Sequence, residues 1–388
     1  MNNYQLYAPT FITGRGSIEF FASLGKKKIG IIRGGRSYND EVRTKIENAA
    51  TSTGADVMYL AQIRNEPYIE DIFACMDKVN EFQPDMILAV GGGSVLDSAK
   101  AIHLFYENPN LTFTEATIPY KLPKLGKKAV HISVPTTSGT GSETTSAAVF
   151  IDSVSKTKKL LLDNTLIPHY AVLDADLTDS LPVPLTISTA LDALAHAIES
   201  STALNSTAIT RAYSIEAALD ILESLPVAVS KFTTVEEKKQ AKENLHIAAS
   251  IAGVAITNSC TGIVHSYDHP GPAFSISHGN ICGLMLPYSL KYVGPHSSYS
   301  KIARRLGYKG TDSELLLALQ NYLFDFIKSF GLPLTFKEMG INESEYLEGA
   351  EKWADISLPA FATQGSPASM TYEKGIAFYK ECFCGIDR

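Results

Sequence analysis

The first half of the chain alternates short apolar runs with amphipathic stretches, and this alternation constrains its fold more than any other feature. Five apolar runs have the length of a strand: Lys28–Arg33, Val57–Leu60, Met86–Val90, Val130–Val134 and Tyr170–Leu173. Runs without polar alternation are typical of a parallel sheet covered on both faces. Helix-like spacing fills the stretches 40–53, 69–82 and 95–106 between them. The pattern predicts βαβ units and a doubly wound α/β domain with a mostly parallel sheet.

The second half is different in character. Runs 147–151 and 158–162 predict a hairpin, but after Leu181 strand-like runs give way to long Ala, Leu, Ile and Glu patterns. These patterns predict helices at 186–201, 206–225, 235–258, 277–291, 313–330 and 372–381. Pro182 and Pro184 cannot lie inside a helix, so they favour a boundary there. A single core rarely exceeds about 250–300 residues, so we predict an α/β domain at 1–181 and an all-helical domain at 182–388.

Composition excludes several classes of protein. The net charge is −7 and no basic tract is interleaved with aromatic residues, so we expect no nucleic-acid partner. The longest apolar stretch, Ile247–Thr257, is too short to span a membrane, and the N-terminus does not resemble a secretory signal. The five cysteines contain no C-x-x-C pair, which predicts reduced thiols, no disulfide framework and no thiolate zinc site. We therefore expect a cytoplasmic protein.

Two polar loops follow predicted strands in the first domain. Gly91-Gly-Gly-Ser94 lies between the strand ending at Val90 and a helix, where close backbone approach and first-turn N–H groups suit a diphosphate. It is not the dinucleotide fingerprint, because Leu96 takes the third glycine position and the loop follows the third strand. The segment Pro135–Glu143, rich in Ser, Thr and Gly, follows another strand. Either loop alone fits a plain turn; together, at one sheet edge, they favour a dinucleotide site.

Acidic and histidine side chains recur at helical spacing in the second domain. Asp192 and His196 lie four residues apart, His265 and His269 repeat that spacing, and His278 follows. Such spacing places both members of a pair on one helix face, suited to one metal ion. A histidine on an apolar helix is often only a core residue, but the whole set favours Fe²⁺, Zn²⁺, Mn²⁺ or Co²⁺. Such a metal ion is a Lewis acid, and together with a bound dinucleotide it is sufficient for hydride transfer between an alcohol and a carbonyl compound.

At these residues the chain resembles the iron-dependent (group III) alcohol dehydrogenases, a superfamily that includes glycerol dehydrogenases and dehydroquinate synthases. The resemblance covers nearly the whole chain. It is carried by Asn65–Pro67, Gly91–Lys100, Pro135–Glu143, Leu191–Glu199 and the segment with His265, His269 and His278.

The resemblance implies metal ligands at Asp192, His196, His265 and His278, with Fe²⁺ as the metal and Zn²⁺ as a possible one. It implies His269 as a catalytic proton-relay group beside the nicotinamide, since imidazole titrates near neutral pH. It also implies the cofactor-binding residues Gly92, Gly93, Ser94, Asp97, Thr136, Thr137, Thr140 and Lys158.

Two positions depart from the family pattern. His269 and His278 are nine positions apart where most relatives have ten, with Pro270-Gly271-Pro272 between them. NAD-preferring members carry an Asp at the end of the first strand, where this chain has Gly34, followed by Gly35, Arg36 and Ser37. Without the carboxylate, and with an arginine and a hydroxyl nearby, a 2′-phosphate is accommodated, so we predict NADP(H) in preference to NAD(H).

The sequence thus predicts an iron-type, NAD(P)-dependent oxidoreductase that acts on a small alcohol, aldehyde or ketone through a metal-bound substrate oxygen, and the family favours a homodimer. The alternatives are an NAD-linked glycerol or polyol dehydrogenase, a dehydroquinate synthase-like lyase, or a non-catalytic dinucleotide- or metal-binding protein. Residues expected near the substrate are small or weakly polar and do not identify it: Ser146, Phe150, Ser259, Cys260 and Phe274.

Overall fold

The computed structural model describes residues 5–35, 38–64, 67–153 and 157–386. The chain forms two compact units, one of residues 1–181 with 235–257 and the other of residues 182–234 with 258–388. The predicted division gave everything after residue 181 to the helical domain. The structure instead assigns the long helix α8 (Val235–Thr257) to the first unit.

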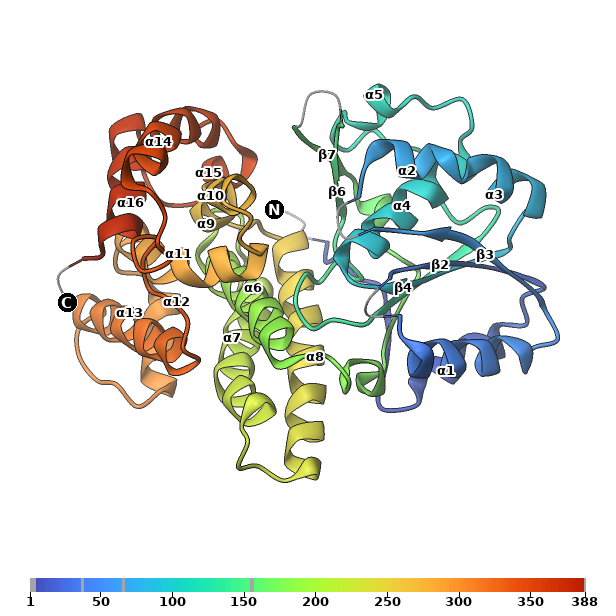
Figure 1. Cartoon of the computed structure of the whole chain (residues 1–388), viewed down its shortest axis with the longest axis horizontal. Helices are drawn as coiled ribbons and strands as arrows, with labels where there is room; N and C mark the ends of the chain where they lie inside the picture. The colour runs from blue at the N-terminus through green and yellow to red at the C-terminus, as the bar shows by residue number, and fades with distance from the viewer. Residues whose placement is uncertain (1–4, 36–37, 65–66, 154–156, 387–388) are drawn as a thin grey trace. The chain divides into compact units, whose positions relative to one another are not determined.

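The first unit is built around a six-stranded sheet in the order β1-β8-β5-β4-β2-β3, and every neighbouring pair is parallel. Figure 1 shows α1 on one face of this sheet and α2, α3 and α4 on the other. The sheet strands are β1 (Thr10–Thr13), β2 (Lys28–Arg33), β3 (Asp56–Gln62), β4 (Met86–Gly91), β5 (Val130–Pro135) and β8 (Tyr170–Leu173). The helices of this unit, besides α8, are α1 (Asp40–Thr51), α2 (Ile69–Ala74), α3 (Met76–Phe82), α4 (Gly93–Glu107) and α5 (Phe113–Ala116).

Both faces of the sheet are covered, which explains the continuous apolar runs. Along β4, Met86, Leu88 and Val90 belong to the cluster that contains Val42 of α1, whereas Ile87 belongs to the cluster of α4. Alternate side chains therefore enter two different cores, and a strand in this position has no polar face. The doubly wound α/β prediction is confirmed.

Most predicted elements of this unit are present, and the differences are local. The hairpin is formed by β6 (Ala147–Ile151) and β7 (Lys158–Leu162), which pair antiparallel outside the main sheet. The helix expected over residues 69–82 is divided at Cys75 into α2 and α3. Strand β1 was not predicted, because its four residues are mostly exposed and carry no apolar run. Three short 3₁₀ helices were also missed: η1 (Ser17–Leu24), η2 (Asn164–Leu166) and η3 (Ala175–Thr178).

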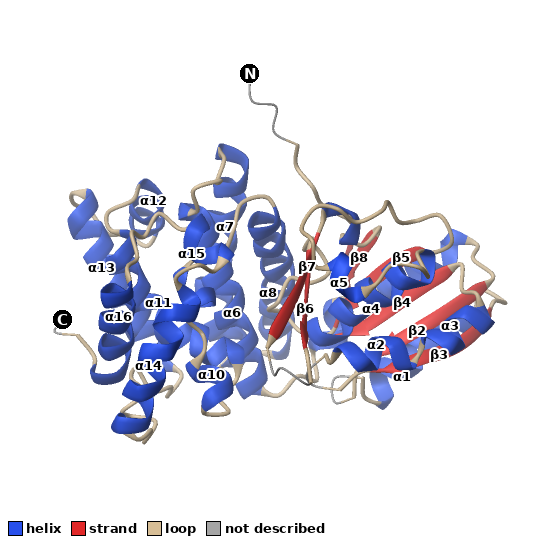
Figure 2. Ribbon diagram, turned by 90° about the horizontal axis from the view of Figure 1, so that it is seen from above, coloured by secondary structure: helices blue, strands red, loops and turns tan. Residues whose placement is uncertain are grey.

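The second unit contains only helices among its described residues, as Figure 2 shows. Helix α6 has Pro184 in its first turn, where the missing N–H costs nothing, so the prolines start this helix instead of interrupting it. The helices are α6 (Val183–Thr202), α7 (Ala208–Val229), α9 (Ile263–Ser266), α10 (Pro270–Ala273), α11 (His278–Val293), α12 (Ser297–Arg305), α13 (Asp312–Ser329), α14 (Glu343–Ser357), α15 (Phe361–Gly365) and α16 (Tyr372–Cys384). The predicted helices are present, but α9, α10, α12, α14 and α15 were missed, and α14 is as long as 15 residues. Across the described residues, every helix is too short or too polar to cross a bilayer.

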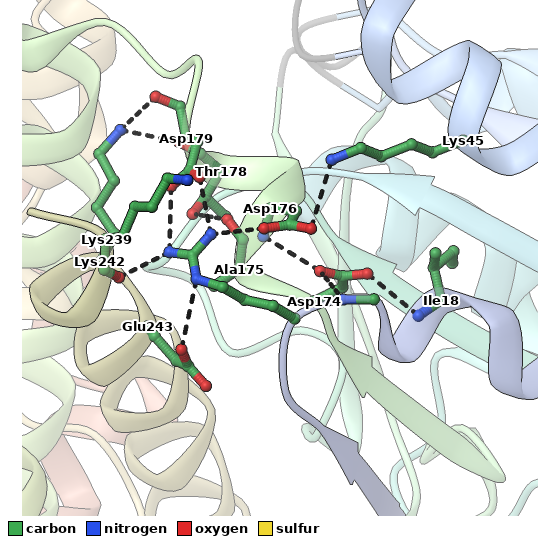
Figure 3. A network of polar contacts seen from close by, with 12 residues as sticks. Ile18, Lys45, Asp174, Ala175, Asp176, Thr178, Asp179, Lys239, Lys242 and Glu243 are labelled. Carbon is green, nitrogen blue, oxygen red and sulfur yellow. Dashed lines mark hydrogen bonds and ion pairs between the residues drawn. The ribbon is translucent and has the colours of Figure 1, made fainter. Parts of the chain in front are cut away.

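A polar network joins α8 to the remainder of the first unit (Figure 3). The Arg15 guanidinium lies 2.6 Å from Asp176 Oδ1 and 2.7 Å from Asp179 Oδ2, and it donates to the carbonyl of Lys239 in α8. From α8, Lys242 Nζ donates to the carbonyl of Asp179. Charged hydrogen bonds of this kind are stronger than neutral ones, so one arginine ties the chain after β8 to a helix more than fifty residues later.

Two glycines bring α8 against the Ser/Thr-rich loop. A Cβ on Gly253 of α8 would lie 2.7 Å from Gly141 O and would also overlap the Thr144 hydroxyl. Gly141 itself has φ of +63°, a conformation that favours glycine. Buried hydroxyls continue this contact: Ser138 Oγ lies 3.0 Å from His246 Nδ1, and Ser250 Oγ donates to Glu143. Helix α8 therefore supports the loop that follows β5.

Burial of His246 predicts a loss of stability in acid. Desolvation lowers the pKa of His246 from 6.5 to about 4. Between these values the unfolded chain binds the extra proton, so the stability of the first unit falls as pH falls below about 6.5. We expect His246 to account for about 2 kcal/mol of the free energy of unfolding lost between pH 7 and pH 5.

Urea unfolding at both pH values, for wild type and His246→Gln, measures this difference. The variant should lose about 2 kcal/mol less than wild type on acidification, because glutamine does not titrate. Equal losses in the two proteins would contradict the assignment.

Candidate functional site

The predicted metal ligands converge inside the second unit. Asp192 and His196 lie one turn apart on α6, His265 lies on the short helix α9, and His278 is the first residue of α11. Helix α11 packs directly on α6 because glycines occupy the contact. A Cβ on Gly279 would overlap the Ser188 carbonyl, and one on Gly283 would lie 2.7 Å from Leu191 Cδ1. Close helix packing thus brings His278 to the carboxylate of Asp192.

Three imidazoles face one carboxylate oxygen. Asp192 Oδ1 lies 3.3 Å from His278 Nε2, 3.5 Å from His265 Nε2 and 3.7 Å from His196 Nε2. Asp192 is 3% exposed, yet its Oδ1 has no hydrogen-bond partner. Two ligands about 2.0–2.2 Å from one ion at a tetrahedral angle lie about 3.3–3.6 Å apart. The spacing and the unsatisfied oxygen both fit a shared cation.

A cysteine that sequence reasoning missed joins this group. Among the described residues, one ligand atom each from Asp192, His265, His278 and Cys282 lie within 4.8 Å of one another and form a donor group, to which the predicted ligand His196 does not belong. Cys282 is fully buried on α11, four residues after His278. The absence of a C-x-x-C pair hid it; its i, i+4 spacing from a histidine was the available signal.

Two further carboxylates contact the Nδ1 atoms of His265 and His278, the ring nitrogens that do not face Asp192. Glu199 Oε2 lies 2.5 Å from His265 Nδ1, while its Oε1 accepts from the backbone N–H of Val264 at 2.7 Å. Asp268 Oδ2 lies 3.1 Å from His278 Nδ1. Such contacts fix the imidazole tautomer that carries its proton on Nδ1 and leave Nε2 free to bind a metal.

Neighbouring groups in the cluster stabilise the charged forms of Asp192 and His265. Burial alone would raise the pKa of Asp192, but His196 and His278 hold that pKa well below its ordinary value. Burial alone would lower the pKa of His265, but Cys282 and Glu199 raise it well above 6.5. In the absence of a cation His265 and His278, whose pKa values are both raised, therefore carry protons that a metal ion would have to displace.

The other residues expected near the reaction lie in different surroundings. His269 occupies the position before α10, is half-buried and does not belong to the donor group. Cys260 is buried, and Phe274 stacks on Tyr346 with ring centroids 6.2 Å apart. In the first unit Ser146 is buried, and Phe150 is fully buried in the core of that unit. Ser259 is half-buried in the segment after α8.

The two polar loops of the first unit lie side by side. Strands β4 and β5 are neighbours, and Thr136 N donates to Gly91 O at 3.0 Å. A Cβ on Gly93 would lie 2.8 Å from Thr140 Cγ2, and one on Gly92 would lie 3.4 Å from Thr137 Oγ1. Glycine is therefore required at Gly93 to fit against the second loop.

These loops stand where α/β sheets bind ligands. Strand β2 pairs with β3 on one side and with β4 on the other. The backbone N–H of Gly34, directly after β2, donates to the carbonyl of Val90 in β4. The carboxyl ends of β2 and β4 thus flank the point at which the strand order reverses. Gly92, at the N-terminus of α4, has no side chain to cap the first-turn N–H groups, and those groups suit an anion.

The remaining predicted cofactor residues are placed as follows. Ser94 is half-buried in the first turn of α4, and Thr136 is buried with no hydrogen-bond partner for its hydroxyl. Asp97 is buried and accepts from Val149 N in β6 and from Lys100, so its carboxylate holds the hairpin. Lys158 is exposed on β7, and Gly35 is exposed after β2. Arg36, Ser37, Asn65 and Glu66 lie outside the described residues.

Comparison with known proteins matches this architecture over almost its full length. The family described as iron-containing alcohol dehydrogenase matches residues 8–175, and its C-terminal counterpart matches residues 186–383. The NADPH-dependent butanol dehydrogenase of Clostridium saccharobutylicum is 33% identical over 379 residues, which cover 96% of each chain. An alcohol dehydrogenase of Thermococcus barophilus is 31% identical and covers 96% of this chain and 97% of its own. The solved structure of an iron-containing alcohol dehydrogenase from Thermococcus thioreducens, 27% identical, superposes with a TM-score of 0.88 over 99% of this chain and 100% of its own.

Removing the charge of Glu199 tests the positioning of His265. We expect Glu199→Gln to weaken binding of Zn²⁺ by about 10- to 100-fold, because loss of an outer carboxylate disturbs both the tautomer and the orientation of its histidine. Chelator competition measures the affinity. Glu381→Gln is the matched control, since Glu381 pairs with Lys291 and Tyr292 elsewhere in the same unit. Equal affinities in both variants would contradict this role for Glu199.

Proposed function

Since the chain belongs to the iron-containing alcohol dehydrogenase family, we propose that it transfers a hydride between NADP(H) and a small alcohol or aldehyde, with a divalent metal held by Asp192, His196, His265 and His278. In the oxidative direction the alcohol loses its hydroxyl proton to solvent and a hydride from its carbon to NADP⁺. The products are the carbonyl compound, NADPH and a proton. Reduction is the reverse.

One observation carries this proposal. A buried carboxylate oxygen without a hydrogen-bond partner stands among three imidazole nitrogens at 3.3–3.7 Å. Buried charges in proteins are paired or bind a metal. A cation bound there would supply Lewis-acid stabilisation of negative charge on a substrate oxygen.

The protein's own groups bind and orient the reactants. Glu199 and Asp268 hold His265 and His278 by their Nδ1 atoms, so that both Nε2 atoms point to Asp192. The Gly92–Gly93 turn and the first-turn N–H groups of α4 receive the cofactor diphosphate. We assign the proton relay to His269, because a half-buried imidazole can exchange a proton with both solvent and substrate near neutral pH.

The preference for NADP(H) rests on the end of β2. Gly34 offers no carboxylate to repel a 2′-phosphate, and Arg36 follows it. Arg33 adds positive charge at the same strand end, with its guanidinium 5.3 Å from the ring centre of Tyr38 and 5.5 Å from that of Tyr59. The relative from Clostridium saccharobutylicum is named as NADPH-dependent.

The cellular setting belongs to the same proposal. All five cysteines are free, which supports a reducing compartment such as the cytoplasm. The proposed homodimer rests on the family alone.

Metal removal tests the role of the cation. Chelator-treated protein should lose aldehyde reduction with NADPH and regain it when Fe²⁺ or Zn²⁺ is restored. Asp192→Asn should lose metal and turnover together, while NADPH binding, followed by fluorescence, stays within about twofold because the dinucleotide loops lie in the other unit.

Undiminished turnover in rigorously metal-free wild type would refute the metal role. Net oxidation of NADPH also separates this function from that of a dehydroquinate synthase-like lyase, which leaves its cofactor unchanged overall.

The cofactor preference has its own test. Wild type should show a higher kcat/KM with NADPH than with NADH, and Arg36→Ala should reduce that ratio by about tenfold or more, because a charged hydrogen bond to phosphate contributes roughly 1.5–3 kcal/mol. Arg305→Ala, which removes an arginine paired with Glu216 in the other unit, is the control. A wild-type ratio favouring NADH, left unchanged by Arg36→Ala, would reject the preference.

A further inference from the structure

We propose that the sulfur of Cys282 is a ligand of the metal ion in the second unit, an inference that rests on the metal dependence proposed above. The thiol gives up its proton to solvent as the sulfur–metal bond forms. The site then carries a soft thiolate in addition to its carboxylate and imidazoles. This revises the expectation from sequence that the chain has no thiolate site.

The fold places this sulfur beside the other proposed ligands. His278 and Cys282 lie four residues apart in α11, so their side chains project from the same face of the helix. The glycines of α11 that face α6, Gly279 and Gly283, let this face approach Asp192 closely. The helix that delivers the last histidine therefore also delivers the thiol.

The distances fit one shared ion. Cys282 Sγ lies 3.6 Å from His278 Nε2 and 4.0 Å from His265 Nε2. A sulfur about 2.3 Å and a nitrogen about 2.0–2.1 Å from one ion lie about 3.6–4.0 Å apart when the angle at the ion is about 110–135°. The nitrogens that face the sulfur are the same Nε2 atoms that face Asp192, whereas the Nδ1 atoms are held by Glu199 and Asp268.

A second observation points to a ligand independently of the cysteine. Asp192 Oδ1 is buried, lacks a hydrogen-bond partner and belongs to the same group of donor atoms as the sulfur. The sulfur is therefore part of the group of donor atoms that contains this oxygen. A weak S–H hydrogen bond to one imidazole would not account for the unsatisfied carboxylate oxygen.

Burial indicates the side from which the sulfur binds. Cys282 is fully buried, whereas the side chain of His278 is 45% exposed. The sulfur therefore approaches from the protein interior, and the accessible side of the ion remains for the substrate. A thiolate favours Zn²⁺ over hard ions such as Mn²⁺, so Cys282 adjusts which metal the site selects.

X-ray absorption at the zinc edge of the full-length, zinc-loaded protein tests the sulfur directly. Wild type should show one sulfur at about 2.3 Å, and Cys282→Ala only nitrogen and oxygen at about 2.0–2.2 Å. Cys382→Ala is the matched control, because Cys382 is equally buried in the same unit but does not belong to the donor group. It should keep the sulfur signal.

Metal selectivity gives a second measurement. The ratio of Zn²⁺ to Mn²⁺ affinity should fall by at least about tenfold in Cys282→Ala, since even the loss of an outer partner costs about 10- to 100-fold. Cys382→Ala should leave the ratio unchanged. Cobalt-substituted wild type should show a sulfur-to-metal charge-transfer band, which needs no variant to fold.

The outcomes separate the two proposals. A zinc-loaded wild type with only nitrogen and oxygen ligands, and with metal-dependent turnover, would overturn the role of Cys282 and leave the proposed function intact. A wild type that binds no metal and still turns over would overturn both. A sulfur signal that survives Cys282→Ala would also reject this assignment.

Discussion

The structure of the second unit depends on a buried negative charge that needs a positive partner. Asp192 is held inside the unit with three imidazoles around one of its oxygens. An isolated buried carboxylate costs several kcal/mol, so protons on the histidines or a cation must balance it. The helix-to-helix contact through Gly279 and Gly283 and the outer carboxylates Glu199 and Asp268 all serve to hold that arrangement.

The first unit has a backbone surface that suits the anionic ligand proposed for it. Parallel strands bring their carboxyl ends to one edge, where the turn at Gly93 fits against Thr140. Helix α8 supports that edge, because Gly253 packs on Gly141 and Arg15 joins the helix to the chain after β8. The proposed function thus places a dinucleotide site in the first unit and a metal site in the second.

Where local pattern decides structure, the sequence was sufficient. The apolar runs predicted the strands from β2 to β8, and the i, i+4 spacing of Asp192 and His196 placed both on one helix face. The sequence did not predict contacts between residues that lie far apart in the chain. Helix α8 belongs to the first unit because of its contacts with Arg15 and Gly141, which precede it by more than ninety residues. Strand β1 is short and exposed. Cys282, Glu199 and Asp268 come close to the histidines only when α6, α9 and α11 meet, which spacing within one helix does not show.

The most direct measurement of the central claim is anomalous diffraction from crystals of the metal-loaded protein. We expect one strong anomalous peak within about 2.0–2.2 Å of ligand atoms from Asp192, His196, His265 and His278, and about 2.3 Å from the sulfur of Cys282. A well-ordered cluster without a peak in crystals of protein that contains stoichiometric metal, or a peak at another position, would contradict it.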